Sequence, residues 1–267
     1  QAERDVHCLP QASVVAPENE TGRYACMERE LVRSWRMGFK SHFAFTAIQL
    51  PGYLGDCGTF DQCMANLLPM RLAQDAPLLP DPAAAVTATY DQGCPFGVAT
   101  SACPFGSVHN VNKAPIGARV ATQLRRLMLK QDIVSEGPRV THISSRLLSA
   151  AEGGGNEVTV LFEGGSRPFY QHGTENCARC CQWSVGQPAT NASSNDYDAS
   201  GDHGQTFVNG SVAVLTPTLD GVIFTVPTLE RVTHVRYTGN QPFPQCALYN
   251  REGFPALPFW KPVDEYL

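Results

Sequence analysis

Two side chains in the sequence, Asp91 and His109, combine residue types and positions that suit acid-base chemistry. Asp91 follows directly after Ala83-Ala-Ala-Val-Thr-Ala-Thr-Tyr90, an apolar run that predicts a buried strand, and α/β enzymes hold reacting groups where such strands end. His109 lies in the loop that follows, just before a predicted helix. Imidazole titrates near neutral pH, so His109 suits the role of a general base. Two structural alternatives remain open: His109 as a solvated loop residue, and Asp91 as the cap of a turn.

The elements that must position these residues alternate between helix and strand over roughly the first 135 residues. Residues 23–36 predict an amphipathic surface helix with its apolar stripe facing the core, and residues 42–50 form a dense, β-favouring run typical of a buried strand. A further helix is predicted after His109. The two apolar stripes consist of Tyr24, Met27, Leu31 and Trp35, and of Ile116, Val120, Leu124 and Leu127. This order of helix and strand predicts an α/β fold with a parallel sheet.

Beyond about residue 135 the pattern changes to short alternating or β-branched runs, separated by clusters of Gly, Pro, Asn and Ser. The runs cover 158–162, 211–215, 222–226 and 232–237. Because residues 132–138 interrupt the helical pattern, we place a domain boundary there. The prediction is an α/β domain over residues 1–135 and a β-rich, β-sandwich-like domain over residues 136–267.

The composition is that of a globular protein, with 43% apolar and 17% charged residues and a formal net charge of -5. Lys and Arg are scattered, so the sequence shows no electrostatic footprint for nucleic acid or an anionic membrane surface. It also has no run of about 20 apolar residues that could span a bilayer. A neutral or weakly charged ligand such as a sugar fits this balance.

Cysteine usage indicates an oxidising compartment, because ten dispersed cysteines are unusual in a reduced cytosolic protein. We expect most of them to form disulfides. The Cys177-Ala-Arg-Cys180-Cys181 cluster with nearby His172 has a zinc-ligand spacing, but disulfides are the favoured interpretation. Cys94 and Cys103, before His109, suggest a cysteine nucleophile as the alternative to disulfide partners. Sequons at Asn19, Asn191 and Asn209 agree with a secreted or lysosomal glycoprotein.

Several segments, taken in order, resemble the sialate O-acetylesterase family. The most specific is Cys103-Pro-Phe-Gly-Ser-Val-His109-Asn-Val-Asn112-Lys113, followed by Gly117-Ala-Arg119, which resembles the histidine block of that family. Upstream and downstream segments resemble segments of the family that come in the same order, so the resemblance covers about residues 23–260. These segments are Tyr24-Ala-Cys26, Leu31-Val-Arg-Ser-Trp35-Arg36, Phe43-Ala-Phe-Thr-Ala-Ile-Gln-Leu50, Val232-Thr-His-Val-Arg-Tyr237, Gln245-Cys246-Ala-Leu-Tyr249 and Leu257-Pro-Phe259.

The resemblance implies an SGNH-type α/β hydrolase domain joined to a β-rich domain. It further implies removal of O-acetyl groups from sialic acids or related sugars by a serine and histidine mechanism, without metal or cofactor. His109 is then the catalytic base. SGNH hydrolases usually carry Asp three residues before this histidine, a position occupied here by Gly106, so Asp91 becomes the candidate acid.

Two further blocks of the family are missing. Nothing matches its Gly-Gln-Ser-Asn nucleophile block, since the one Gly-x-Ser triplet, Gly164-Gly-Ser166, precedes Arg167, and no tryptophan begins a Trp-Gly-Gly segment. We therefore expect the serine to lie upstream of Gln1 or on a second chain, so that this chain alone is inactive. The absence of an initiating Met or a signal-type leader at Gln1 predicts a processed N-terminus or a fragment.

The alternative interpretation is a non-catalytic protein, a glycan-binding or inactive remnant of the same family. A missing nucleophile is what this alternative predicts. Trp35, Trp183 and Trp260 are candidates for stacking on sugar rings, with core packing as the commoner role of a tryptophan.

Overall fold

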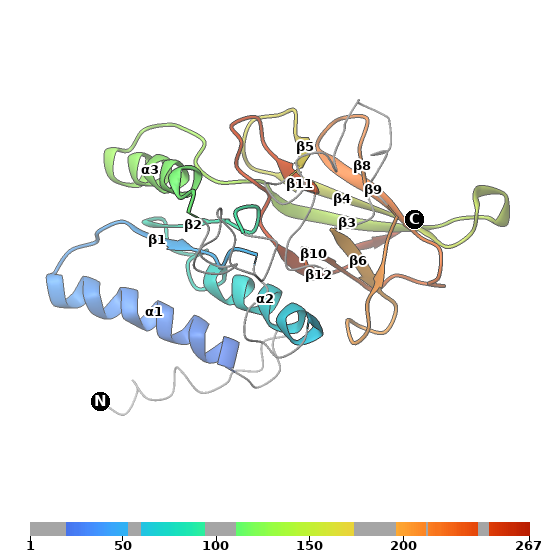
Figure 1. The fold of residues 1–267 in the computed structure, drawn as a ribbon, viewed down its shortest axis with the longest axis horizontal. Helices are drawn as coiled ribbons and strands as arrows, with labels where there is room; N and C mark the ends of the chain where they lie inside the picture. Colours follow the sequence, from blue (N-terminus) through green and yellow to red (C-terminus); the bar gives the residue numbers. More distant parts are fainter. Residues whose placement is uncertain (1–19, 53–59, 94–110, 174–195, 212, 240–245) are drawn as a thin grey trace.

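The computed structural model describes residues 20–52, 60–93, 111–173, 196–211, 213–239 and 246–267. Its N-terminal part holds two strands between helices (Figure 1). The strands pair in parallel, with Phe45 opposite Ala84, which confirms the predicted parallel pairing for these two strands. One helix lies on one side of the pair and two on the other. These elements are α1 (Glu20–Phe39), β1 (Phe45–Ile48), α2 (Phe60–Asp75), β2 (Ala84–Thr87) and α3 (Ala114–Leu129).

Helix α3 is tied to both strands by one buried amide. The Gln123 side chain donates to the carbonyl oxygen of Val86 at 2.7 Å and accepts from the hydroxyls of Thr87, at 2.6 Å, and Thr46. The helix begins with a proline in its first turn, where the missing N–H costs no hydrogen bond, and is capped by Lys130 at a φ of 53°. Its most buried side chains are Arg119, Gln123 and Leu127. The face of α3 that contacts the strands is therefore partly polar, because the strands present hydroxyl and carbonyl groups to it. The predicted apolar stripe lies beside this face.

Helix α1 is present as predicted, but the prediction that its apolar stripe faces the core is wrong. Met27, Leu31 and Trp35 are 68%, 43% and 44% exposed. The buried residues are Val32 and Glu28, on the side that packs against α2. Periodicity identifies the residues that share a helix face, whereas the face that is buried depends on the neighbouring helix.

The remainder of the described chain is a set of short strands (Figure 1). A five-stranded sheet has the order β13-β3-β4-β9-β8, a four-stranded sheet the order β12-β10-β6-β7, and β11 pairs with β5. The strands are β3 (Arg139–Leu147), β4 (Asn156–Glu163), β5 (Tyr170–Gly173), β6 (Tyr197–Ser200), β7 (Val208–Asn209), β8 (Val214–Leu215), β9 (Gly221–Val226), β10 (His234–Tyr237), β11 (Cys246–Tyr249), β12 (Phe259–Pro262) and β13 (Glu265–Tyr266).

Alternation along these strands buries one face of each sheet. Inward positions of β4, β9 and β10 are buried and the intervening ones less so, the pattern of a half-buried antiparallel sheet. Aromatic rings join the two larger sheets: Phe162 meets Phe259 at 6.0 Å, and Tyr197 stacks on Phe224 at 5.4 Å. The fold is mixed α/β, with several sheets and few helices. The sandwich-like arrangement and the domain limits at residue 135 stay predictions.

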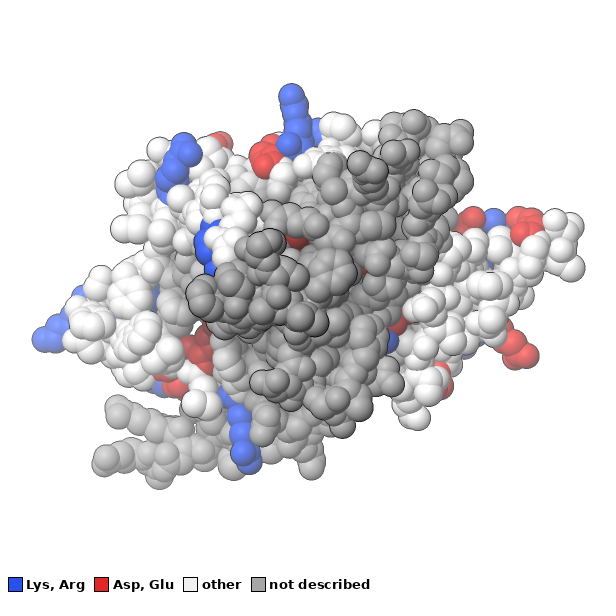
Figure 2. All heavy atoms as spheres, in the orientation of Figure 1, with Lys and Arg blue, Asp and Glu red and all other residues white. Residues whose placement is uncertain are grey.

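The described surface is mixed in charge. On the face shown in Figure 2, basic and acidic side chains of the described residues are interspersed. Among the described helices, none combines the length and apolar character needed to cross a membrane.

Candidate functional site

Asp91 lies where the buried strand β2 ends, and its carboxylate is held by three side chains. It is 1% exposed. Arg119 donates to both carboxylate oxygens, at 2.8 and 2.6 Å, in the two-pronged geometry that suits guanidinium and carboxylate. The Tyr249 hydroxyl donates to Oδ2 at 2.9 Å, and the Gln92 amide lies 3.3 Å from the same oxygen. The site is therefore a buried ion pair with added hydrogen bonds.

The partners of Asp91 keep their protons. Burial disfavours a charged guanidinium, but the hydrogen bonds and negative charge of Asp91 outweigh it and raise the pKa of Arg119. Burial, with the charge of Asp91 adding to it, also raises the pKa of Tyr249, so its hydroxyl stays a donor. Tyr170 stacks on Tyr249, with ring centroids 5.5 Å apart. Arg119 in addition donates to the carbonyl oxygen of Ala88 at 2.9 Å, which joins α3 to the segment after β2.

The neighbouring Tyr90 is inserted into the β-rich part. Its hydroxyl donates to the carbonyl oxygen of Ala256 at 2.7 Å and lies 3.0 Å from the hydroxyl of Tyr237. The Tyr237 hydroxyl accepts from the backbone N–H of Leu248 at 3.1 Å. Tyr90 and Asp91 thus contact residues from segments that are far apart in the chain.

Three of the segments quoted in the sequence analysis meet at Tyr90 and Asp91. Arg119, Tyr237 and Tyr249 each end one of the quoted segments, and they converge on Asp91 and Tyr90. Reasoning from the sequence assigned none of the three a role. The signal was present, because all three stand in the matching segments, but their meeting point depends on tertiary contacts.

His109 lies outside the described residues, within the segment 94–110 that also holds Cys94 and Cys103. Asp91 precedes this segment, Arg119 of α3 follows it, and the two form the buried ion pair. A direct contact between Asp91 and His109 stays a prediction.

The cysteine predictions fall mainly outside the described side chains. Cys26 of α1 is disulfide-bonded. The other nine cysteine side chains, with the Cys177, Cys180 and Cys181 cluster and the His172 side chain, lie outside the described residues. In the described part of the chain, no group of three His, Cys, Asp or Glu residues is placed to hold a metal ion.

The three tryptophans differ in their surroundings. Trp35 projects from the exposed side of α1, Trp183 lies outside the described residues, and Trp260 of β12 is partly exposed. The Trp260 ring meets Phe207 edge to face at 5.4 Å. The predicted core-packing role therefore does not hold for Trp35.

Comparison with known proteins gives a likeness in fold. No protein-family model matches the sequence, and no curated protein sequence matches it. Among solved structures, the chain is similar to one described as a novel carbohydrate acetylesterase from Xanthomonas citri, with a TM-score of 0.62 and 18% sequence identity. The likeness covers 96% of this chain and 48% of that structure, so the chain spans about half the length of its neighbour. The fold is therefore like that of a carbohydrate esterase.

Proposed function

We propose that this chain is part of a carbohydrate esterase that removes acetyl groups from sugars, O-acetylated sialic acids among them. The observation that carries the proposal is the fold, shared over 96% of the chain with a structure described as a carbohydrate acetylesterase. The convergence of the quoted segments on Tyr90 and Asp91 adds support, because it gives the sequence resemblance a structural basis.

In the proposed mechanism His109 is the general base. It accepts the proton of a serine hydroxyl as the serine oxygen attacks the acetyl carbonyl, and it returns that proton to the departing sugar oxygen. Water, deprotonated by His109, then attacks the acetyl-serine and releases acetate, and the proton goes back to the serine. Backbone or side-chain donors stabilise the oxyanion in both steps. No metal or cofactor takes part in this proposal.

Asp91 supports His109 in this mechanism as a positioning residue. Its ion pair with Arg119 joins the end of β2 to α3, the two described elements that flank the segment of His109. Holding a base within hydrogen-bond reach of its nucleophile contributes to the rate, since small displacements are costly. The pH dependence of acetate release by an Asp91→Asn variant distinguishes this role from a direct contact between Asp91 and the imidazole.

We further propose that the serine and the oxyanion donors come from polypeptide beyond these 267 residues, an upstream segment or a second chain. The described hydrolase-like part holds only two parallel strands, β1 and β2, and two-stranded sheets rarely stand alone. Each of them has an edge that no other described strand covers, and α1 exposes an apolar stripe beside them.

The proposed location is a secreted or lysosomal compartment. The disulfide of Cys26 supports an oxidising environment. The sequon residue Asn209 is exposed at the end of β7, where a glycan could be attached.

The test is acetate release by the natively purified protein, whose subunits are first identified by intact mass and N-terminal analysis. With O-acetylated sialic acid as substrate, His109→Ala should lower kcat about a thousandfold, because a general base is lost. His142→Ala is the matched control. His142 lies on β3 beside Asp264 and Glu265, and the variant should keep full activity. Undiminished turnover by the His109 variant would refute the proposed role.

A second candidate function, glycan binding without turnover, is favoured by the partly exposed Trp260. Absence of acetate release from every natural form, together with retained binding of sugar, would select it over the esterase.

A further inference from the structure

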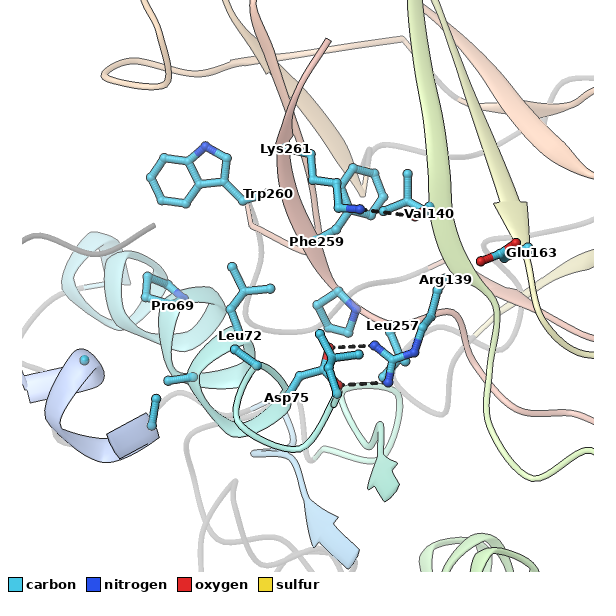
Figure 3. A pocket seen from close by; sticks show the side chains of 16 residues that line it. Pro69, Leu72, Asp75, Arg139, Val140, Glu163, Leu257, Phe259, Trp260 and Lys261 are labelled. Atoms are coloured by element: carbon cyan, nitrogen blue, oxygen red, sulfur yellow. Dashed lines mark hydrogen bonds and ion pairs between the residues drawn. The ribbon is translucent and has the colours of Figure 1, made fainter. Parts of the chain in front are cut away.

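A cavity of about 460 Å³ lies between helix α2 and strand β12, apart from the Asp91 site (Figure 3). None of Asp91, Arg119 and Tyr249 lines it. Its volume is within the usual range for small-molecule pockets. The cavity is thus a second place at which this chain could hold a ligand.

The two walls of the cavity differ in character. The helical wall, from α1 and α2, is small and aliphatic, with Ala25, Pro69, Leu72 and Ala76. The opposite wall, from the sheets, carries an aromatic ring and long charged side chains (Figure 3). These are Arg139, Glu163, Trp260 and Lys261. A ligand that fits both walls must be apolar on one side and hydrogen-bonding on the other.

Trp260 is fixed as a platform rather than free to move. The Trp260 and Phe207 rings meet edge to face, with 5.4 Å between their centroids. The indole also lies against Gly204, where an added Cβ would come within 3.1 Å of the indole nitrogen. A glycine at this position therefore makes room for the ring. A rigid aromatic surface binds a flat ligand with little loss of conformational entropy.

The charges that line the cavity are balanced. Arg139 and Asp75 form a two-pronged ion pair at 2.7 and 2.9 Å, drawn as dashed lines in Figure 3. Lys261 donates to the carbonyl oxygen of Val140 at 3.3 Å, which leaves donors of its ammonium for a ligand. With Glu163 the lining has two basic and two acidic side chains, which favours a neutral ligand over an anionic one.

We propose that this cavity binds a neutral, acetylated sugar residue, as a second glycan site of the protein. The pyranose C–H face lies on Trp260, and the acetyl methyl group packs against the aliphatic wall at Leu72. The choice of an acetylated sugar rests on the proposed function, since a glycan that carries the ester for the Asp91 site would carry acetylated neighbours. The second site would hold such a neighbour while the ester is cleaved elsewhere.

The experiment is saturation-transfer NMR on the natively purified protein, with the methyl glycoside of N-acetylglucosamine as the probe. Magnetisation should pass most strongly to the acetyl methyl protons. Trp260→Ala should weaken binding at least about tenfold, as truncation of a central aromatic contact does. Ala76→Phe should do the same, because the exposed Ala76 can be enlarged into the cavity without disturbing the core. Trp35→Ala, which removes a tryptophan outside the cavity, is the matched control and should bind normally.

Three outcomes would overturn the proposal: equal binding of methyl glucoside, displacement of the probe by octanoate, or unchanged binding by both cavity variants. Equal binding of the glucoside would show that the acetyl group is not recognised, and displacement by octanoate would show an amphiphile site. The measurement requires no turnover, so it is separable from the proposed function. Acetate release without probe binding would refute the second glycan site and leave the proposed esterase function standing. Probe binding without acetate release would refute the esterase function and leave the second site standing.

Discussion

At the scale of single residues, the Asp91 carboxylate holds together three parts of the chain. Its oxygens bind Arg119 from α3 and Tyr249 from β11, while its own position is set by β2. A buried ion pair of this kind stabilises little compared with an apolar packing of the same volume, but removal of one member leaves the other charge unpaired. The pair therefore fixes how β2 and α3 lie against each other more than it adds to the free energy of unfolding.

Asp91→Asn tests this role. The substitution leaves the guanidinium of Arg119 without its counterion, so the free energy of unfolding should fall by about 3 kcal/mol. In the active protein kcat should fall as well. If Asp91 acts only through its ion pair with Arg119, the midpoint of the pH-rate profile should stay where it is, whereas a direct contact with His109 would move it. Urea unfolding and the pH dependence of acetate release are the measurements.

Tyr249→Phe is the control for that experiment. It removes one donor to the Asp91 carboxylate and keeps the ion pair, so it should cost about 2 kcal/mol, less than Asp91→Asn. A stability of the Asp91 variant equal to that of the natural protein would contradict the account.

Only part of this site could be predicted from the sequence. A strand followed by an acidic residue is a local pattern, so the position of Asp91 at the end of β2 was foreseeable. Its partners were not, because Arg119 and Tyr249 lie 28 and 158 positions away and the pairing depends on how the segments pack. Both residues end segments that were quoted for the resemblance, but nothing in the sequence indicates that they contact Asp91.

At the scale of elements, the sequence predicts the presence of α1, α3, β1, β2, β4, β9 and β10, since each has a clear period or a dense β-favouring run. Helix α2 was missed. It contains Pro69, which interrupts the hydrogen-bond ladder of a helix and argues against one. The face of α1 was misassigned, because Glu28 rather than the apolar stripe turns towards α2.

Glu28 makes the packing of α1 dependent on pH. The side chain is 8% exposed, and its Oε2 has no hydrogen-bond partner among the residues that the structure describes. Burial, with repulsion from Asp75 adding to it, raises the pKa of Glu28 from 4.5 to about 7. Between these values the folded protein binds the extra proton, so the free energy of unfolding falls as the pH rises. The stability that depends on this bound proton is fully present below about pH 4.5 and is lost above about pH 7.

Glu28→Gln should therefore stabilise the protein by about 2 kcal/mol at pH 8 and leave it almost unchanged at pH 4.5. Chemical denaturation across this range measures both values. Glu30→Gln, on the exposed side of the same helix, is the control and should change the stability by less than about 0.5 kcal/mol at either pH. A gain of the same size at both pH values for the Glu28 variant would exclude the titration as its cause.

At the scale of the whole molecule, the helical and β-rich parts share one core. A single cluster of buried apolar residues includes Val32 and Val86 from the first part and Val160 and Phe259 from the second. The ion pair between Arg139 and Asp75 also crosses from β3 to α2. The two regions that were predicted separately are thus joined by apolar packing and by an ion pair. The alternation of apolar and polar residues within each strand could not reveal this arrangement.

Tyr90 is the side chain that joins the two parts most directly. It is fully buried, meets Tyr237 edge to face at 5.9 Å and bonds to Ala256. We therefore expect one cooperative unfolding transition. In variants that retain only Trp35, on α1, or only Trp260, on β12, fluorescence should give the same denaturation midpoint.

Tyr90→Ala should lower the free energy of unfolding by about 4 kcal/mol, since it opens a large cavity between the parts. It should also separate the two midpoints, with Trp35 reporting the earlier loss because its part has the smaller sheet. Tyr266→Ala, at an exposed tyrosine, should keep the midpoints together. Different midpoints in proteins that retain Tyr90 would show that the two parts unfold independently, and the shared core would then be a contact between domains rather than a single folding unit.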